Sequence, residues 1–164
     1  MAGACSGCRT SFSARRTEPR SGSQRGVAFP VDLMPQDEHE IREVLLRYAT
    51  GIDRRDWSLL ATCFTEDFVG DYGSFGSWTG PQQITQYMRN AHAALGPTLH
   101  RLTNVDIRQQ GTATQSRTYV DALLMPAEVD GEPRQGIGYY DDEWSKTSAG
   151  WKIRRRRFTL VRQI

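Results

Sequence analysis

The chain has 164 residues and a net charge of +2, and 38% of its residues are hydrophobic. This length suits one domain with its own core. No segment approaches the roughly 18 consecutive apolar residues that a membrane-spanning helix requires, and three cysteines are too few for a disulfide framework, so we expect a cytoplasmic protein without a membrane segment.

Residues 1–33 are predicted to be a disordered basic tail in front of a single domain over residues 34–164. The first 29 residues are rich in Ser, Gly and Arg and show no apolar periodicity, a composition that favours disorder. Five arginines and one glutamate give these residues a net charge of +4. Because the whole chain is +2, residues 30–164 have a net charge of −2. The basic balance therefore belongs to the tail and does not indicate a nucleic-acid partner. A targeting peptide is the alternative interpretation of this segment.

The first predicted element of the domain is an amphipathic helix over residues 37–54. Its apolar residues follow the i, i+3, i+4, i+7 spacing of one helix face. Asp37 is a candidate N-cap residue, with Glu40 three positions later as in a capping box. The apolar face is formed by Ile41, Val44, Leu45, Tyr48, Ala49 and Ile52.

Two further helices are predicted before the chain turns to strands. A short helix over residues 56–64 is followed by a strand, a turn and a glycine-rich segment up to residue 80. Gly80-Pro81 then opens a third helix over residues 81–95, and Gly96-Pro97 is expected to end it.

The remainder of the chain predicts a series of antiparallel strands. Asp130-Gly131 is typical of a hairpin turn between two of them. Three helices followed by such strands indicate an α+β domain with helices packed on one face of the sheet. The predicted strands cover residues 98–110, 112–128, 134–148 and 150–164.

Four segments resemble the SnoaL-like branch of the nuclear transport factor 2-like superfamily. They are RYATGIDRRDWSLLATCFTEDF, SWTGPQQITQYM, the segment around PTLHRLTNVDI, and GYYDDEWSKTSAGWKIRRR. The pattern is similar to the bile acid 7α-dehydratase, scytalone dehydratase and lindane dehydrochlorinase members. The resemblance implies a cone-shaped fold in which a curved antiparallel sheet and three N-terminal helices enclose a pocket.

In those enzymes an Asp at the end of the first helix orients a His that removes a proton from carbon. Asp53 and His100 stand at the matching positions, and Tyr48 matches a tyrosine of the bile acid dehydratase. The dehydrochlorinase has a lysine in place of Tyr48, which argues against that activity here. The resemblance therefore predicts His100 as general base, Asp53 as its orienting partner and Tyr48 as a hydrogen-bond donor.

Four more residues are expected to contact the substrate. Asn104 shares a predicted strand face with His100, and Arg156 matches an arginine of the dehydrochlorinase. Tyr119 and Asp141 lie on strands that line the pocket in this fold. No metal site is expected, because Cys5 and Cys8 lack nearby partners and the three histidines lack a helical i, i+4 spacing.

The function that the sequence favours is a cofactor-free, dehydratase-like lyase acting on a small hydrophobic substrate. A ring isomerase or polyketide cyclase begins with the same proton abstraction and stays open. A non-catalytic ligand-binding protein is the alternative of another class, and the small subunit of an aromatic-ring dioxygenase is a third. A homodimer or homotrimer is expected, because an outer sheet face carrying Val120, Leu124 and Trp144 would need cover.

Overall fold

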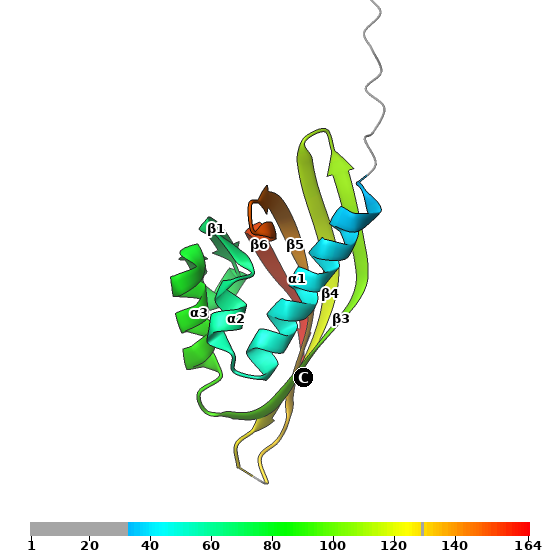
Figure 1. The fold of residues 1–164 in the computed structure, drawn as a ribbon. Helices are drawn as coiled ribbons and strands as arrows, with labels where there is room; N and C mark the ends of the chain where they lie inside the picture. The colour runs from blue at the N-terminus through cyan, green and yellow to red at the C-terminus, as the bar shows by residue number, and fades with distance from the viewer. Residues whose placement is uncertain (1–32, 129) are drawn as a thin grey trace, which may run out of the picture.

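The computed structural model describes residues 33–128 and 130–164 of the chain as helices packed on one curved sheet (Figure 1). The predicted tail, Leu33 excepted, lies outside the described residues. None of the described helices has both the length and the apolar character needed to span a membrane. The helices are α1 (Pro35–Asp53), α2 (Trp57–Ala61), the short 3-10 helix η1 (Gly73–Phe75) and α3 (Gly80–Ala91).

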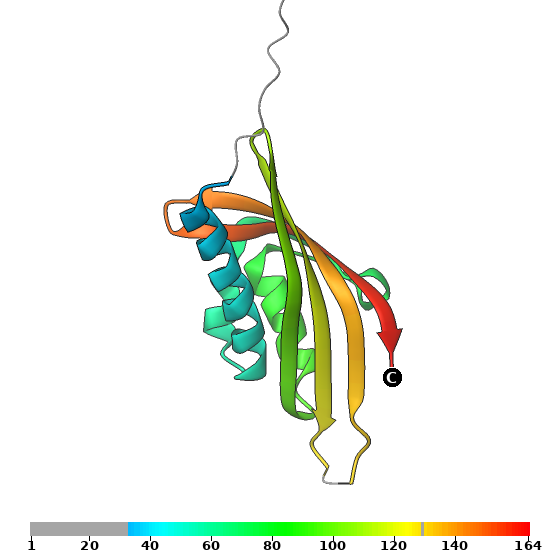
Figure 2. The same cartoon turned by 90° about the vertical axis from the view of Figure 1, so that its right-hand side faces the viewer.

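The sheet has six strands in the order β2-β1-β6-β5-β4-β3. All neighbours pair antiparallel except β1 and β6, which run parallel, so the expected fully antiparallel sheet is corrected to a mixed one. Figure 2 shows the long strands curving around the helices, which cover a single face. The strands are β1 (Phe64–Asp71), β2 (Ser77–Thr79), β3 (Leu95–Gln110), β4 (Ala113–Pro126), β5 (Arg134–Thr147) and β6 (Gly150–Gln163).

The helices depart from the predicted arrangement in two respects. Of the three α-helices in the described residues, α2 has only 5 residues. A strand was expected between the second and third helices, and the structure has β1 and β2 there. The helix predicted to reach residue 95 ends at Ala91, and Gly96-Pro97 belong to the start of β3. A glycine-proline pair therefore opens an edge strand here instead of stopping a helix.

The predicted capping box at Asp37 is wrong. Helix α1 begins at Pro35, and its N-cap residue Met34 makes no side-chain cap. Proline suits the first turn because its missing N–H would have no partner there. The Asp37 carboxylate instead accepts a hydrogen bond of 2.9 Å from Trp151 Nε1 and pairs with Lys146. It thus joins the first turn of α1 to the β5–β6 hairpin.

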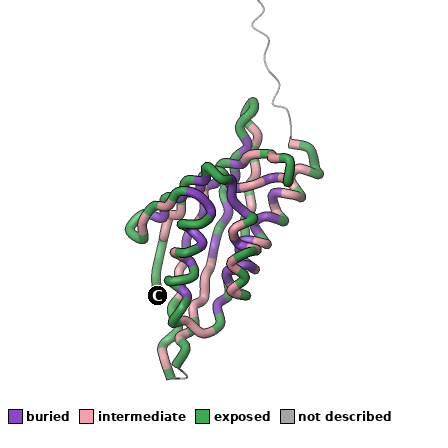
Figure 3. The backbone as a smooth tube through the Cα atoms, turned by 60° about the vertical axis from the view of Figure 1, so that its left-hand side comes forward, coloured by how far each residue is buried: buried purple, intermediate pink, exposed green. Residues whose placement is uncertain are grey.

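The core lies between the helices and the sheet face that they cover, which we call the inner face (Figure 3). Apolar residues of α1 meet alternate residues of β4, β5 and β6, because strand side chains point to opposite faces in turn. The predicted face of α1 is confirmed, since each of its six apolar residues is buried. The inner-face residues of the sheet core include Val120, Tyr140, Trp144, Trp151 and Ile153.

Candidate functional site

The end of α1 and the start of β3 bring the two predicted catalytic residues together. Asp53 Oδ1 lies 2.7 Å from His100 Nδ1, which meets the expected contact between carboxylate and ring nitrogen. Asp53 Oδ2 also accepts the backbone N–H of His100 at 2.9 Å. The carboxylate therefore holds both the ring and the main chain of His100.

Two neighbours hold the Asp53 carboxylate in place. Thr98 Oγ1 donates to Asp53 Oδ1 at 2.9 Å, and Arg55 Nη1 donates to Thr98 Oγ1 at 2.9 Å. Arg55 also donates to the carbonyl oxygens of Ile52 and Gly96, at 2.7 and 2.8 Å. Its cation lies at the helix C-terminus, where an acidic residue such as Asp53 would otherwise meet the unfavourable end of the helix dipole.

The electrostatics of this pair favour an ionised carboxylate. Burial by itself would raise the pKa of Asp53, but hydrogen bonds from His100 and Thr98 outweigh it and lower that pKa below its usual value. An ionised carboxylate at Nδ1 places a proton on that nitrogen, because the carboxylate can only accept. Neutral His100 then has Nε2 free as an acceptor, which is the arrangement of a general base.

His100 faces a cavity of about 250 Å³ between α3 and the inner face of the sheet. Its wall is mainly aromatic and aliphatic, as is usual for sites that bind small organic molecules. The exposed Arg134 and Gln163 also line it. Besides His100 the lining includes Tyr48, Tyr72, Phe75, Tyr87, Met88, His92, Leu95, Val120, Ala122, Leu124, Tyr140, Phe158 and Leu160.

Tyr48 lies on the cavity wall within a group of aromatic rings. Its phenol oxygen is 3.4 Å from that of Tyr72, and its ring packs edge-on against Tyr140 with centroids 5.6 Å apart. Burial raises the pKa of Tyr72 and of Tyr140 well above the usual range. These two phenols therefore stay protonated, and Tyr72 can donate to the Tyr48 oxygen, which leaves the Tyr48 proton available to another acceptor.

Arg156 lies behind the aromatic wall. Its guanidinium makes two hydrogen bonds of 2.7 and 2.8 Å to Asp142, and both side chains are fully buried. It stacks on the rings of Tyr48 and Tyr140 at 4.2 and 4.0 Å from their centroids. Arg156 thus orients two lining residues, while it is itself absent from the cavity lining.

Three of the predicted substrate contacts lie away from the cavity. Tyr119 is 46% exposed, and Asp141 pairs with Arg117 at 2.7 Å on the outer face of the sheet. Asn104 is exposed and has a φ of 49° within a bulge of β3. The bulge interrupts the alternation that was expected to place Asn104 beside His100. These three assignments to the pocket are wrong.

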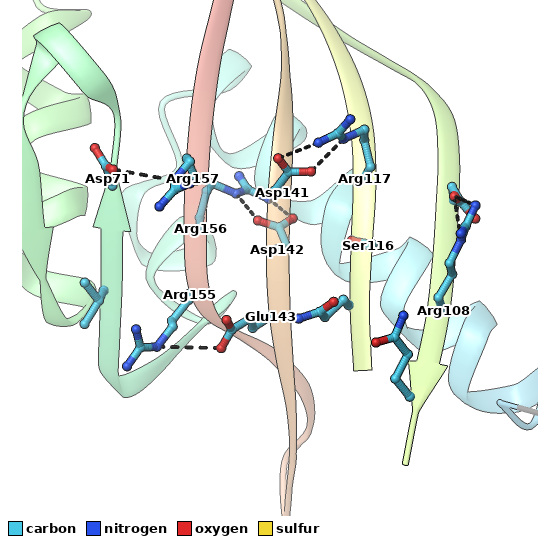
Figure 4. A pocket seen from close by; sticks show the side chains of 14 residues that line it. Asp71, Arg108, Ser116, Arg117, Asp141, Asp142, Glu143, Arg155, Arg156 and Arg157 are labelled. Atoms are coloured by element: carbon cyan, nitrogen blue, oxygen red, sulfur yellow. Dashed lines mark hydrogen bonds and ion pairs between the residues drawn. The ribbon is translucent and has the colours of Figure 1, made fainter. Parts of the chain in front are cut away.

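The outer face carries a row of alternating charges (Figure 4). Asp71, Arg157, Asp141 and Arg117 stand opposite one another on β1, β6, β5 and β4. Opposite charges on neighbouring strands stabilise such a row modestly, because these pairs are exposed to water.

The outer face lacks the apolar residues on which the oligomer prediction was based. Val120 and Trp144 are buried on the inner face, and Leu124 lines the cavity. The homodimer or homotrimer stays a prediction, but its stated reason is removed.

Of the residues that line the cavity, Tyr48 and His100 alone had been predicted as part of the site. Tyr72, Tyr140 and Phe158 come from three different strands or their ends, and no local pattern distinguishes them from ordinary core residues. His92 carried a signal, because it continues the helical spacing of Ile84 and Met88 on the buried face of α3. That signal identifies a buried face but no chemical role.

Two glycines on the cavity side of β5 allow a matched pair of substitutions. A Cβ at Gly138 would overlap the carbonyl oxygen of Thr159 and lie 2.8 Å from the Phe158 ring, whereas one at Gly136 would meet only Leu160, at 3.9 Å. We expect Gly138→Ala to lower the free energy of unfolding by about 1–3 kcal/mol. Gly136→Ala should change it by less than about 0.5 kcal/mol. Urea unfolding of both variants measures this, and equal effects would contradict the close packing at residue 138.

Residues 33–128 and 130–164 contain no group of three or more His, Cys, Asp or Glu arranged to hold a metal ion. In the site, Asp53 is paired with His100, while His92 bonds to the Met88 carbonyl oxygen.

Comparison with known proteins identifies the class. Residues 35–157 match the SnoaL-like domain family, and the chain belongs to that family within the nuclear transport factor 2-like superfamily. An uncharacterized protein of Mycobacterium tuberculosis is 30% identical over 124 residues, which cover 73% of this chain and 82% of that protein.

Two solved structures share the fold. A candidate scytalone dehydratase of Novosphingobium aromaticivorans has a TM-score of 0.72 at 21% identity, and the match covers 79% of this chain and 87% of that one. A hexachlorocyclohexane dehydrochlorinase of Novosphingobium barchaimii has a TM-score of 0.71 at 16% identity, with 79% and 89% covered.

Proposed function

We propose that this protein is a cofactor-free enzyme that takes a proton from a carbon atom of a small hydrophobic, ring-containing substrate. The observation that carries the proposal is the 2.7 Å contact between Asp53 and His100 Nδ1, with the His100 ring on the wall of an aromatic cavity. A pure binding protein has no need of a histidine oriented in this way. The names of the two similar solved structures denote eliminations, one of water and one of hydrogen chloride.

The proposed reaction is a dehydration. His100 Nε2 takes the proton from carbon, and the electrons of the C–H bond form a carbon–carbon double bond. The C–O bond breaks, and the departing hydroxide receives a proton from the imidazolium and leaves as water. Asp53 stabilises the imidazolium that forms on the way, and Tyr48 donates a hydrogen bond to the substrate oxygen on which charge develops.

An isomerase would share the first step and return the proton to another carbon. Deuterium exchange separates these functions. Wild-type protein is incubated in D₂O with a panel of cyclic ketones and β-hydroxyketones, while calorimetry records which compounds bind. We expect loss of water from a β-hydroxyketone, and deuterium at the same carbon of the recovered ketone wherever the imidazolium returns a deuteron before the C–O bond breaks, both measured by mass spectrometry.

Uptake without loss of water would favour the isomerase. Compounds that bind with neither uptake nor loss of water would leave the ligand-binding protein as the better description. Asp53→Asn should slow the uptake nearly as much as loss of His100 does. His39→Ala, which changes an exposed histidine of α1, is the matched control and should leave it unchanged.

A further inference from the structure

His92 is a second histidine of the cavity with no part in the mechanism above. It follows α3 directly, is 8% exposed and lines the cavity. Its ring centroid lies 5.9 Å from that of His100 and 6.3 Å from that of Trp57. A polar ring in this position stands beside the proposed base and within reach of the same substrate.

The hydrogen bonding of His92 determines its tautomer. Nδ1 lies 2.8 Å from the carbonyl oxygen of Met88, and a carbonyl oxygen can only accept. Nδ1 therefore carries the proton, and Nε2 of the neutral ring is an acceptor. Burial lowers the pKa of His92, and the Met88 hydrogen bond opposes this only in part. The ring is thus neutral near neutral pH.

His92 Nε2 has no hydrogen-bond partner among the described residues, although it is buried. Buried polar atoms without a partner are uncommon and destabilising, so a partner from outside the protein is the simplest explanation. A carbonyl or carboxylate oxygen cannot be this partner, because it has no proton to donate. The partner must carry an O–H or N–H group.

We propose that His92 Nε2 accepts a hydrogen bond from a hydroxyl group of the substrate, held beside the carbon that His100 deprotonates. The proposal rests on the proposed function, whose dehydration already requires a hydroxyl group, and it assigns the binding of a substrate hydroxyl to a particular residue. His92 is then a substrate-binding residue that selects for this group. A site built to accept such a hydrogen bond discriminates against analogues that lack the donor.

The test measures binding with two probes that share a ring. 4-Ethylphenol carries the O–H group, and 4-ethylanisole replaces that hydrogen with a methyl group. We expect the wild type to bind the phenol roughly 5- to 100-fold more tightly, as one buried acceptor left unpaired implies. In His92→Phe, which keeps the ring shape without an acceptor, the two dissociation constants should become nearly equal by calorimetry.

Two further variants test whether the preference for the phenol depends on His92, on His100 or only on the size of the side chain. His92→Gln can present an amide oxygen and should restore part of the preference. His100→Phe should retain the preference, because the donor is bound elsewhere. The proposal would be overturned if the preference for the phenol were lost in His100→Phe but kept in His92→Phe. It would also be overturned if the wild type bound both probes equally, which is the result expected if a water molecule occupies His92 Nε2.

A measurement on the wild type protects the test against variants that fail to fold. In ¹⁵N NMR the Nε2 resonance of His92 should shift on addition of 4-ethylphenol, while Nδ1 stays protonated. A shift confined to His100 would contradict the proposal. These binding results do not depend on turnover, so a failure of the proposed reaction and a failure of the His92 assignment can be told apart.

Discussion

Replacement of His100 by alanine should lower the rate of proton abstraction by roughly 10²- to 10⁴-fold, the usual contribution of a general base. The variant removes the nitrogen that would receive the proton, while the aromatic wall of the cavity is unchanged. Substrate affinity should therefore fall much less than turnover. The rates of the wild type and of His100→Ala are compared as kcat for deuterium exchange, on a compound identified by the D₂O panel.

Asp53→Asn should reduce this rate nearly as much, because an amide cannot stabilise the imidazolium as a carboxylate does. The double variant should be little slower than either single one, since the two residues act as one unit. Tyr48→Phe should have a smaller effect, because it removes one hydrogen-bond donor. Strictly multiplicative losses at His100 and Asp53 would contradict the pairing, even though the two side chains lie 2.7 Å apart.

The second large effect is expected at the buried ion pair behind the cavity. Asp142→Leu leaves the Arg156 guanidinium buried without its counter-ion, because both side chains have no exposed surface. Removal of one partner from a buried pair costs about 3–5 kcal/mol of stability. Urea unfolding should show this loss, and the tyrosines that stack on Arg156 should become less ordered.

Two comparisons make this prediction specific. Asp141→Asn, at the preceding residue of β5, affects an exposed pair with Arg117 and should cost no more than about 1 kcal/mol. The double variant Asp142→Leu/Arg156→Met removes both charges and should regain much of the lost stability. Similar losses of stability for Asp141→Asn and Asp142→Leu would show that burial does not determine how much the Asp142–Arg156 pair contributes to stability. A double variant less stable than Asp142→Leu would show that Arg156 contributes mainly through its aromatic contacts.

The residues along one helix could be assigned to a face from the sequence, whereas those along the strands could not. The spacing from Ile41 to Ile52 determines a single apolar face, because a helix has one continuous stripe to bury. A strand has two faces, and alternation does not say which one the helices will cover. Val120 and Trp144 were therefore expected on the outer face, and the structure buries them on the inner one.

A similar limit explains the misplaced site residues. Alternation along β3 was counted without the bulge at Asn104, and one extra residue in a strand moves the following side chains to the other face. Arg156 was expected to contact the substrate, yet it is covered by Tyr48 and Tyr140. The position of Arg156 behind these tyrosines depends on how three elements pack together, and no local sequence pattern predicts it.

The sequence by itself determined the α+β class, the buried face of α1 and, through its resemblance to a family, the pairing of Asp53 with His100. Each of these depends on a local period or on a recognisable short segment. Only the tertiary structure decided which sheet face encloses the cavity, and it alone placed His92 beside His100 with an unpaired nitrogen. These features depend on contacts between distant residues, and the burial of a polar atom is a property of everything that surrounds it.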